Sequence, residues 1–229
     1  MSTFLEVTNK VLQRFNEIPL TASTFANATG FHFVVKEAVN NSIREINRES
    51  FQWPFNQKTA SVFLVIDQTF YDVPLNAKVL DFDTFTIKYI RSGEENFNVL
   101  LHTDYDRYIR QDYERDQKLK GDPAERVPLS VFQYGEQYGI APIPSNTDQI
   151  DFTYWGWPDE LILDVDEVSV PSRFDDVIVL GSMVECYEFR TMTQQAARVE
   201  GKFQAGIKNM RTLLLNDLTK MSDTRVGRM

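Results

Sequence analysis

The run Ser61-Val62-Phe63-Leu64-Val65-Ile66 marks the point where a 229-residue chain changes from helical periodicity to that of strands. Its β-branched and aromatic residues favour a strand, and Asp67-Gln68-Thr69 offers turn chemistry before a short run at residues 70–73. Similar runs recur further along, and we expect more strands over residues 82–90, 97–101, 127–134, 138–141 and 149–155. The middle of the chain is therefore predicted to be rich in β-structure.

Before this region the sequence predicts a first, short helix. Thr3 and Glu6 have the spacing of a capping box, in which a hydroxyl and a carboxylate bond reciprocally to backbone N–H groups. Apolar residues then recur at helical spacing over residues 4–15, and Pro19 ends the helix. The polar stretch 21–30 is expected to be a loop.

A second helix is expected over residues 31–50. Trp53-Pro54-Phe55 should stop it, because proline disfavours helix in the residue before it. Its buried face is predicted to consist of four apolar residues at helical spacing, namely Val35, Val39, Ile43 and Ile46.

Between the predicted strands lies a polar stretch, residues 103–120, with interleaved acids and bases. Such a composition suits an exposed helix that carries charge pairs. Gly121-Asp122-Pro123 is expected to close it.

Helical periodicity returns after Pro171. Ser172 is a plausible cap, and Asp175 and Asp176 lie in the first turn, where the helix dipole favours acids. The buried face of this helix is predicted to hold Phe174, Val177, Ile178, Gly181 and Val184. A last helix is predicted from apolar residues near every fourth position, which are Val199, Phe203, Met210, Leu214 and Leu218.

The order of helices, strands and helices predicts an α+β fold. We expect a helical bundle, made of two N-terminal and two C-terminal helices, with an inserted β-rich region and an exposed charged helix. Residues 221–229 lack a core pattern and are expected to form an extended tail. The predicted divisions are 1–55 and 171–220 for the bundle, 56–170 for the β-rich insertion and 221–229 for the tail.

Composition is that of an ordinary globular protein, with 42 % hydrophobic and 25 % charged residues. The N-terminus lacks the apolar run of a signal peptide, and no stretch approaches the roughly 20 apolar residues of a membrane span. Cys186 is the sole cysteine, which excludes an intrachain disulfide and a thiolate metal cluster. We therefore expect a protein made in a reducing cytoplasm, without contact to a membrane.

Charge is unevenly distributed along the chain. The net charge is −9, yet residues 198–229 carry seven bases against three acids, which leaves −13 for the remainder. Residues 122–190 hold fourteen acids against three arginines. Overall acidity argues against a protein that grips nucleic acid, because neutralising phosphates requires a basic surface. The acidic part could be a solvated face, or an acidic body whose basic tail docks on a partner.

No catalytic motif is present. The sequence lacks the glycine-rich phosphate loops, the zinc-binding HExxH and the GxSxG of hydrolases. His32 and His102 have no evident catalytic partners, and Cys186 fits a small core residue better than a nucleophile. We therefore predict a protein that is not an enzyme and that holds no cofactor and no metal.

Two weaker candidate sites have a structural alternative. Asp81 with Asp83, or Asp164 with Asp166 and Glu167, could offer oxygen ligands to calcium or magnesium, but solvated loop acids are the commoner outcome. Three aromatic residues could stack on a sugar or base, although core packing is commoner for such a cluster. They are Tyr154, Trp155 and Trp157.

Several stretches together resemble the head-to-tail adaptor family of tailed phages, called tail tubular protein A in short-tailed phages. The first helix runs into a Glu-hydrophobe-Pro turn, the second reaches an aromatic Trp-Pro-Phe end, and a strand pair, a Pro-x-Pro turn and two closing helices follow. The resemblance covers nearly the whole chain and rests on the order of these stretches: 16–20, 51–55, 71–74, 79–83, 138–144, 152–155 and 170–174.

The resemblance implies a structural virion protein at the head-to-tail junction. Twelve copies would form a ring below the portal protein, and the ring would join the capsid vertex to the tail and let DNA pass without sequence-specific contact. The bundle would form the ring wall, and the β-rich part would face the next, nozzle-like tail component. The tail would reach the portal through Thr224, Arg225, Val226 and Arg228, since arginine suits paired contacts with carboxylates.

Two other functions remain open at this point. A β-rich module could bind carbohydrate or protein on a platform built from the tryptophans. An enzyme could use Asp164 and Asp166.

Overall fold

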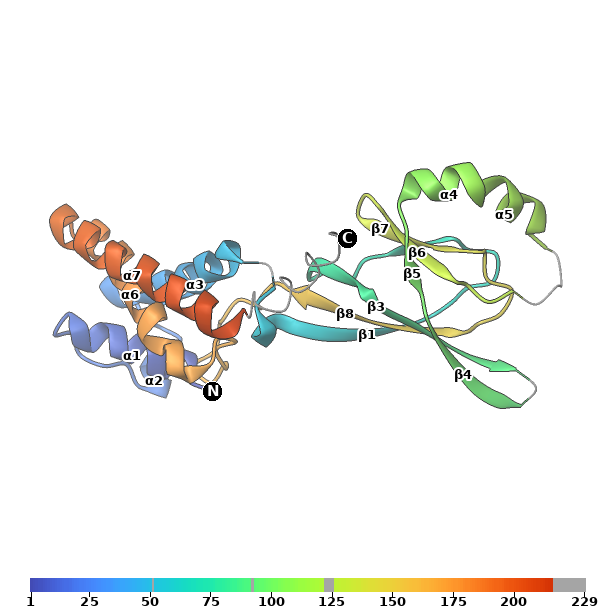
Figure 1. Cartoon of the computed structure of the whole chain (residues 1–229). Helices are drawn as coiled ribbons and strands as arrows, with labels where there is room; N and C mark the ends of the chain where they lie inside the picture. The colour runs from blue at the N-terminus through green and yellow to red at the C-terminus, as the bar shows by residue number, and fades with distance from the viewer. Residues whose placement is uncertain (51, 92, 122–125, 216–229) are drawn as a thin grey trace, which may run out of the picture. The chain divides into compact units, whose positions relative to one another are not determined.

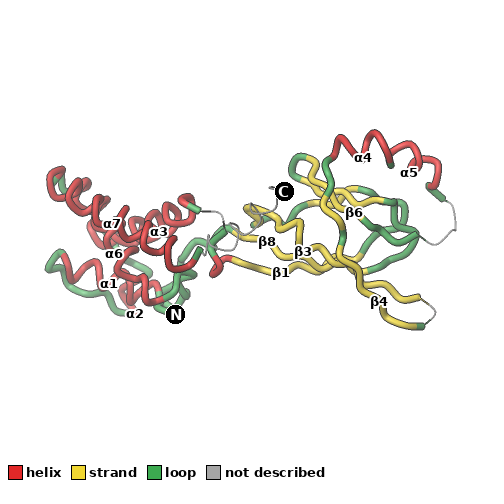
Figure 2. Tube along the Cα trace, in the orientation of Figure 1, coloured by secondary structure: helices red, strands yellow, loops and turns green. Residues whose placement is uncertain are grey.

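The computed structural model describes residues 1–50, 52–91, 93–121 and 126–215 (Figures 1 and 2). Backbone contacts divide the chain into two compact units. The helical unit comprises Met1–Asn56 together with the chain from Pro158 onward, and the β unit comprises Gln57–Trp157. Both sheets lie in the β unit, which also contains two short helices, and this combination of helices and strands confirms the predicted α+β class.

The two predicted N-terminal helices are present in the helical unit. α1 spans Phe4–Arg14 and α3 spans Phe31–Glu49. The capping box of α1 is formed as predicted: Glu6 N–H donates to Thr3 Oγ1 at 3.2 Å, and Thr3 N–H donates to Glu6 Oε2 at 3.0 Å. A short 3₁₀ turn, Pro54–Asn56, follows α3.

The stretch 21–30, predicted to be a loop, contains a four-residue helix, α2, over Ala22–Phe25. Thr21 N–H donates to Thr24 Oγ1 at 2.9 Å, and the ring of Phe25 lies edge-on to Phe4 with centroids 5.0 Å apart. The mostly polar composition of this stretch gave no sign of the helix. One buried aromatic side chain, that of Phe25, is enough to fix a short turn of helix against the core.

The two C-terminal helices are α6, Asp175–Phe189, and α7, Thr193–Leu214. Ser172 does not cap α6 as expected; it begins a 3₁₀ turn, Ser172–Phe174, that leads into the helix. Asp175 lies in the first turn of α6 as predicted, but it is buried, where it accepts from Ser2 Oγ at 2.5 Å and from Lys10 Nζ at 2.6 Å.

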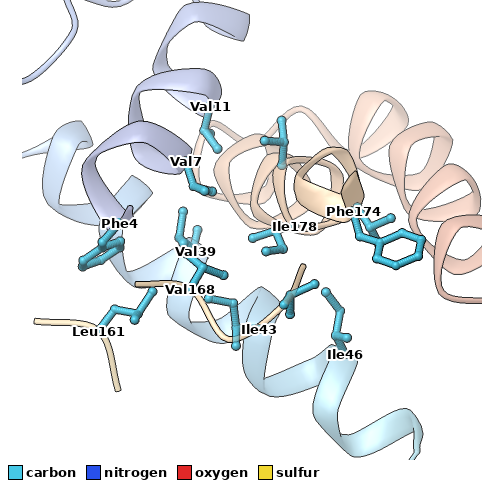
Figure 3. Close-up of a cluster of buried hydrophobic side chains, with 14 of the residues drawn as sticks. Phe4, Val7, Val11, Val39, Ile43, Ile46, Leu161, Val168, Phe174 and Ile178 are labelled. Atoms are coloured by element: carbon cyan, nitrogen blue, oxygen red, sulfur yellow. The ribbon is translucent and has the colours of Figure 1, made fainter. Parts of the chain in front are cut away.

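The core of the helical unit gathers apolar side chains from α1, α3, α6 and α7 (Figure 3). The four residues predicted for the buried face of α3 are all buried, whereas Val184 of α6 is half-buried. Gly181 of α6 lies where α3 and α7 both approach: a Cβ there would overlap Ser42 Oγ and lie 2.8 Å from the ring of Phe203. Glycine at this position therefore lets three helices pack closely.

Residues 158–170 also belong to the helical unit, although the sequence analysis placed them in the β-rich insertion. Leu161, Val168 and Val170 are buried in the helical core. Asn40 of α3 holds the segment by accepting from Leu161 N–H at 3.1 Å and donating to its carbonyl at 3.0 Å. Residues 158–170 form neither a helix nor an extended strand, so their apolar residues follow no period from which this packing could have been predicted.

The β unit contains two four-stranded sheets, with orders β1-β8-β3-β4 and β2-β7-β6-β5. All pairs are antiparallel except β5 with β6. The strands are β1 Gln57–Phe63, β2 Phe70–Asp72, β3 Ala77–Arg91, β4 Glu94–Val99, β5 Leu101–His102, β6 Ser130–Tyr134, β7 Gln137–Ala141 and β8 Gln149–Gly156.

Strand boundaries differ most from expectation at two places. β1 ends at Phe63, so residues 64–66 leave the strand that the run 61–66 predicted. The predicted strand 97–101 is divided between the two sheets at the buried residue Leu100. Leu100 N–H donates to Phe85 O of β3 and Leu101 N–H donates to Leu129 O, just before β6, both at 2.8 Å, so the chain passes from one sheet to the other between consecutive residues.

The predicted charged helix is present as two shorter helices, α4 over Tyr105–Gln111 and α5 over Tyr113–Leu119, divided at Asp112. Charge pairs stabilise α5 as expected, with Lys118 Nζ 2.6 Å from Glu114 Oε1. One acid of this segment, Asp116, is buried, and Arg115 Nε lies 4.0 Å from its Oδ1.

Asp116 makes the stability of the β unit depend on pH. Burial raises its pKa above the ordinary 3.8, and the Ile143 backbone and Arg115 oppose this in part. The folded state therefore favours the protonated carboxyl, and stability is lost as pH rises through the raised pKa. We expect Asp116→Asn to gain about 1 kcal/mol over the wild type at neutral pH and nothing below pH 3. Urea unfolding at both pH values measures this, and an equal difference at the two would contradict it.

Candidate functional site

The sole cysteine has no catalytic surroundings. Cys186 is fully buried in the helical core, and burial raises the pKa of its thiol to about 12. The thiol therefore stays protonated at neutral pH, and it packs as a small hydrophobic group, as the sequence indicated.

The two histidines belong to different units. A ring nitrogen of His32 lies 3.0 Å from the carbonyl oxygen of Ile18, and the ring of His102 stacks on Phe82 with centroids 4.6 Å apart. Each histidine thus has a structural contact, and neither of these contacts is with a nucleophile or an acid.

The segment that carries the acids proposed as metal ligands holds a turn and the start of α1 instead. The side chain of Asp166 accepts from the N–H groups of Ile162 and Leu163, both at 2.7 Å, and these bonds lower its pKa. The carbonyls of Asp166 and Asp164 accept from the first N–H groups of α1, at 2.8 and 3.1 Å. In the part of the chain that the structure describes, no group of three His, Cys, Asp or Glu residues could hold a metal ion.

The second acidic pair is no better placed. Asp81 and Asp83 lie beside an irregularity in the pairing of β3 with β8, between Asp81 and Thr86. The carbonyl of Asp81 accepts from Thr84 Oγ1 at 2.8 Å, so the local backbone is held by the chain itself.

The three aromatic residues do not share a platform. Tyr154 is buried in the core of the β unit, and Trp155, its neighbour in β8, points to the opposite face of the sheet because side chains alternate. Trp157 is partly exposed, and Lys78 Nζ lies 4.3 Å from the centre of its ring. The stacking surface that a sugar or base would need is therefore divided.

The hollows of the β unit do not resemble a catalytic site. One, of about 500 Å³, is lined mainly by apolar side chains with Lys78 and Glu136 at its edge. Another, also of about 500 Å³, lies beside the β3–β4 hairpin and contains Phe63, Lys88 and Glu95. Neither brings a nucleophile together with a base.

Exposed apolar side chains instead gather at two places. In the helical unit they form a turn between residues 161 and 167, in which Ile162 is 70 % exposed, Leu163 59 % and Val165 65 %. In the β unit they lie at the end of β1 and on the β3–β4 hairpin, at Phe63, Ile90, Phe97 and Val99. Clustered exposed apolar groups are typical of surfaces that contact another protein.

The exposed side of α7 is basic. It carries Arg198, Lys202, Lys208 and Arg211 against one acid, Glu200. None of these four bases forms an ion pair with a residue that the structure describes. This helix therefore offers a cationic surface on an otherwise acidic chain.

Comparison with known protein families gives one full-length result. The sequence model of the family described as SU10 adaptor protein matches residues 2–227. The chain belongs to this family. At the level of individual curated proteins, nothing matches it.

Members of the SU10 adaptor protein family are phage adaptors, which confirms the resemblance identified from the order of motifs. The chain therefore has a structural, tail-related role as a component of the virion. Among the described residues of this SU10 adaptor protein, no helix is long and apolar enough to span a membrane.

For an SU10 adaptor protein the relevant sites are contact surfaces, and the sequence analysis proposed one of them. The residues proposed to bind the portal, Thr224, Arg225, Val226 and Arg228, lie outside the described residues. The sequence analysis did not single out the exposed apolar turn at 161–167, because it considered only the acids of this stretch. The signal was the sequence Leu161-Ile162-Leu163-Asp164-Val165, an apolar run with neither strand nor helix periodicity.

Proposed function

We propose that this SU10 adaptor protein assembles as a ring of twelve copies below the portal, joins the capsid vertex to the tail and provides a conduit for DNA. The observation that carries the proposal is the match of the adaptor family over residues 2–227, nearly the whole chain. In this arrangement the β unit faces the next, nozzle-like tail component, and the C-terminal residues reach the portal.

The charge of the chain supports a conduit. Outside residues 198–229 the net charge is −13, so the body of the protein repels phosphate weakly. DNA must slide through a conduit, and an acidic wall avoids the phosphate contacts that would hold it. DNA is thus a passing cargo, without a sequence-specific site.

We also propose that the chain has no catalytic activity and requires no cofactor. The support is the structural use of the candidate groups: Asp166 caps a turn, Cys186 is buried, and Tyr154 belongs to a core. A structural adaptor needs surfaces that fit its neighbours, and reactive groups would serve no purpose in it.

The proposal is tested by the oligomeric state with and without the portal. We expect the isolated protein to be a monomer or a loose oligomer that closes into a ring on portal rings, because the unpatterned tail offers an ordering step on binding. Light scattering of the pure protein and co-sedimentation with portal rings measure the two states. Stable rings of twelve at micromolar concentration without portal would contradict this ordering of events, and failure to bind portal rings would contradict the function.

A further inference from the structure

An exposed glycine in the middle of α7 has no packing explanation among the residues that the structure describes. A Cβ placed on Gly201 would meet no atom within 4 Å. By contrast, close packing explains the other two helical glycines. A Cβ at Gly206 would lie 3.1 Å from Val177, and one at Gly181 would overlap Ser42. Glycine inside a helix destabilises it relative to alanine. The close approach of another surface to α7 would account for Gly201.

Gly201 lies on a strip of small residues that has basic residues on both sides. At 100° per residue Ala197, Gly201 and Ala205 lie along one exposed strip of α7. Arg198 and Lys202 lie on one side of this strip, and Lys208 and Arg211 lie toward the other side, together with the one acid, Glu200. We call the three small residues and the four bases the α7 face. It allows close approach in its centre and offers positive charge at both edges.

Hydrogen bonds hold the apolar turn 161–167 in one conformation. The Asp166 carboxylate fixes the N–H groups of Ile162 and Leu163, and the backbones of Asp164 and Asp166 bond to the start of α1. Val168 N–H donates to the carbonyl of Ser2 at 3.0 Å. The exposed apolar side chains are therefore held in place before any contact, which lowers the entropy cost of binding.

Acids flank the three exposed apolar side chains of this turn. Asp159, Glu160, Asp164 and Glu167 lie within nine residues that contain no base, and of these acids Glu160 is paired with Arg44 of α3 at 3.3 Å. An apolar centre with acidic edges fits a strip of small residues with basic residues beside it. Complementary charges of this kind fix the register of an interface as well as attracting the partner.

We propose that the apolar turn 161–167 of one copy docks on the α7 face of the next copy. This inference rests on the proposed ring, because it names the contact by which neighbouring copies associate. Within one chain the turn bonds to α1 and α3, while α7 packs against α6, and Figure 3 shows Leu161 and Val168 beside α1 and α3. The two surfaces are different, so the contact is heterologous and repeats around a closed ring.

The first test places a large side chain on the α7 face. Gly201→Leu should fold with a melting temperature equal to or a few degrees above that of the wild type, because leucine favours helix. Its incorporation into complexes with portal rings should fall at least tenfold. Gln117→Leu, at an exposed position of α5 in the other unit, is the matched control and should incorporate like the wild type. Normal incorporation of Gly201→Leu, or a lowered melting temperature, would overturn the proposal.

Cross-linking identifies the occupant. Oxidation of portal-bound complexes that carry Leu163→Cys with Gly201→Cys should give dimers and larger multimers on a non-reducing gel, because each copy is linked to both neighbours. Each single variant, and Leu163→Cys with Gln117→Cys, should remain monomeric; Cys186 is buried and does not interfere. A portal-bound double variant without multimers would mean that something other than a second copy covers the α7 face, which contradicts the proposal.

These experiments distinguish a failure of the proposed function from a failure of the proposed contact. If the wild type does not bind portal rings, the proposed function is wrong, and this inference is wrong with it. If the wild type assembles and Gly201→Leu assembles equally well, the ring stands and only the assignment of its contact is wrong.

Discussion

Truncation of the chain after Met221 should abolish its incorporation into portal complexes, while its melting temperature stays within about 2 °C of the wild type. The deleted segment carries Arg225 and Arg228, and its sequence has no core pattern. Its bases can pair with carboxylates of another protein, whereas its loss removes no expected core residue. Co-sedimentation with portal rings and thermal unfolding measure the two effects.

A control separates the length of the tail from its chemistry. Replacing residues 222–229 by a glycine-serine segment of equal length should fail in the same way as the truncation, and Thr224→Ser should bind normally. If the truncated protein sediments with portal rings as well as the full chain does, these residues take no part in the contact.

The variant Phe85→Ala should destabilise the β unit by about 3–5 kcal/mol. Phe85 is fully buried, and its ring stacks on Phe152 with centroids 4.4 Å apart and lies edge-on to Tyr138 at 5.3 Å. Removing the ring loses both the transfer of apolar surface and the packing around the cavity that remains. Urea unfolding followed by circular dichroism measures the change.

The matched control for this variant is Phe97→Ala on β4. Phe97 is 59 % exposed, so its loss should change the free energy of unfolding by no more than about 0.5 kcal/mol. Similar values for the two phenylalanine variants would show that the core of the β unit is not centred on Phe85.

The helices could be predicted from the sequence because their signals are local. Thr3 and Glu6 specify the start of α1 within one turn, and the four-residue spacing of apolar groups specifies α3. The strands were placed, but their partners were not. β1 pairs with β8, some ninety residues later, and no local pattern indicates such a pairing. The crossing at Leu100 depends on hydrogen bonds to Phe85 of β3 and to Leu129 just before β6.

For the candidate sites, too, local features could be predicted and contacts between distant residues could not. The absence of known catalytic motifs can be read from the sequence, because such motifs are local, whereas the lack of enzymatic activity stays a prediction. The role of Asp166 could not, since it depends on the N–H groups of Ile162 and Leu163 and on the start of α1, over 150 residues earlier. The aromatic trio was a candidate until the alternation of β8 placed Tyr154 and Trp155 on opposite faces.

The central claim of this account is that the chain forms the ring at the head-to-tail junction, and electron cryo-microscopy of wild-type protein bound to portal rings tests it most directly. The account predicts a closed ring of twelve copies directly below the portal, around an open channel, with the C-terminal residues of each copy against the portal. Images in which the portal carries no added ring, or in which the protein lies elsewhere on the particle, would contradict it.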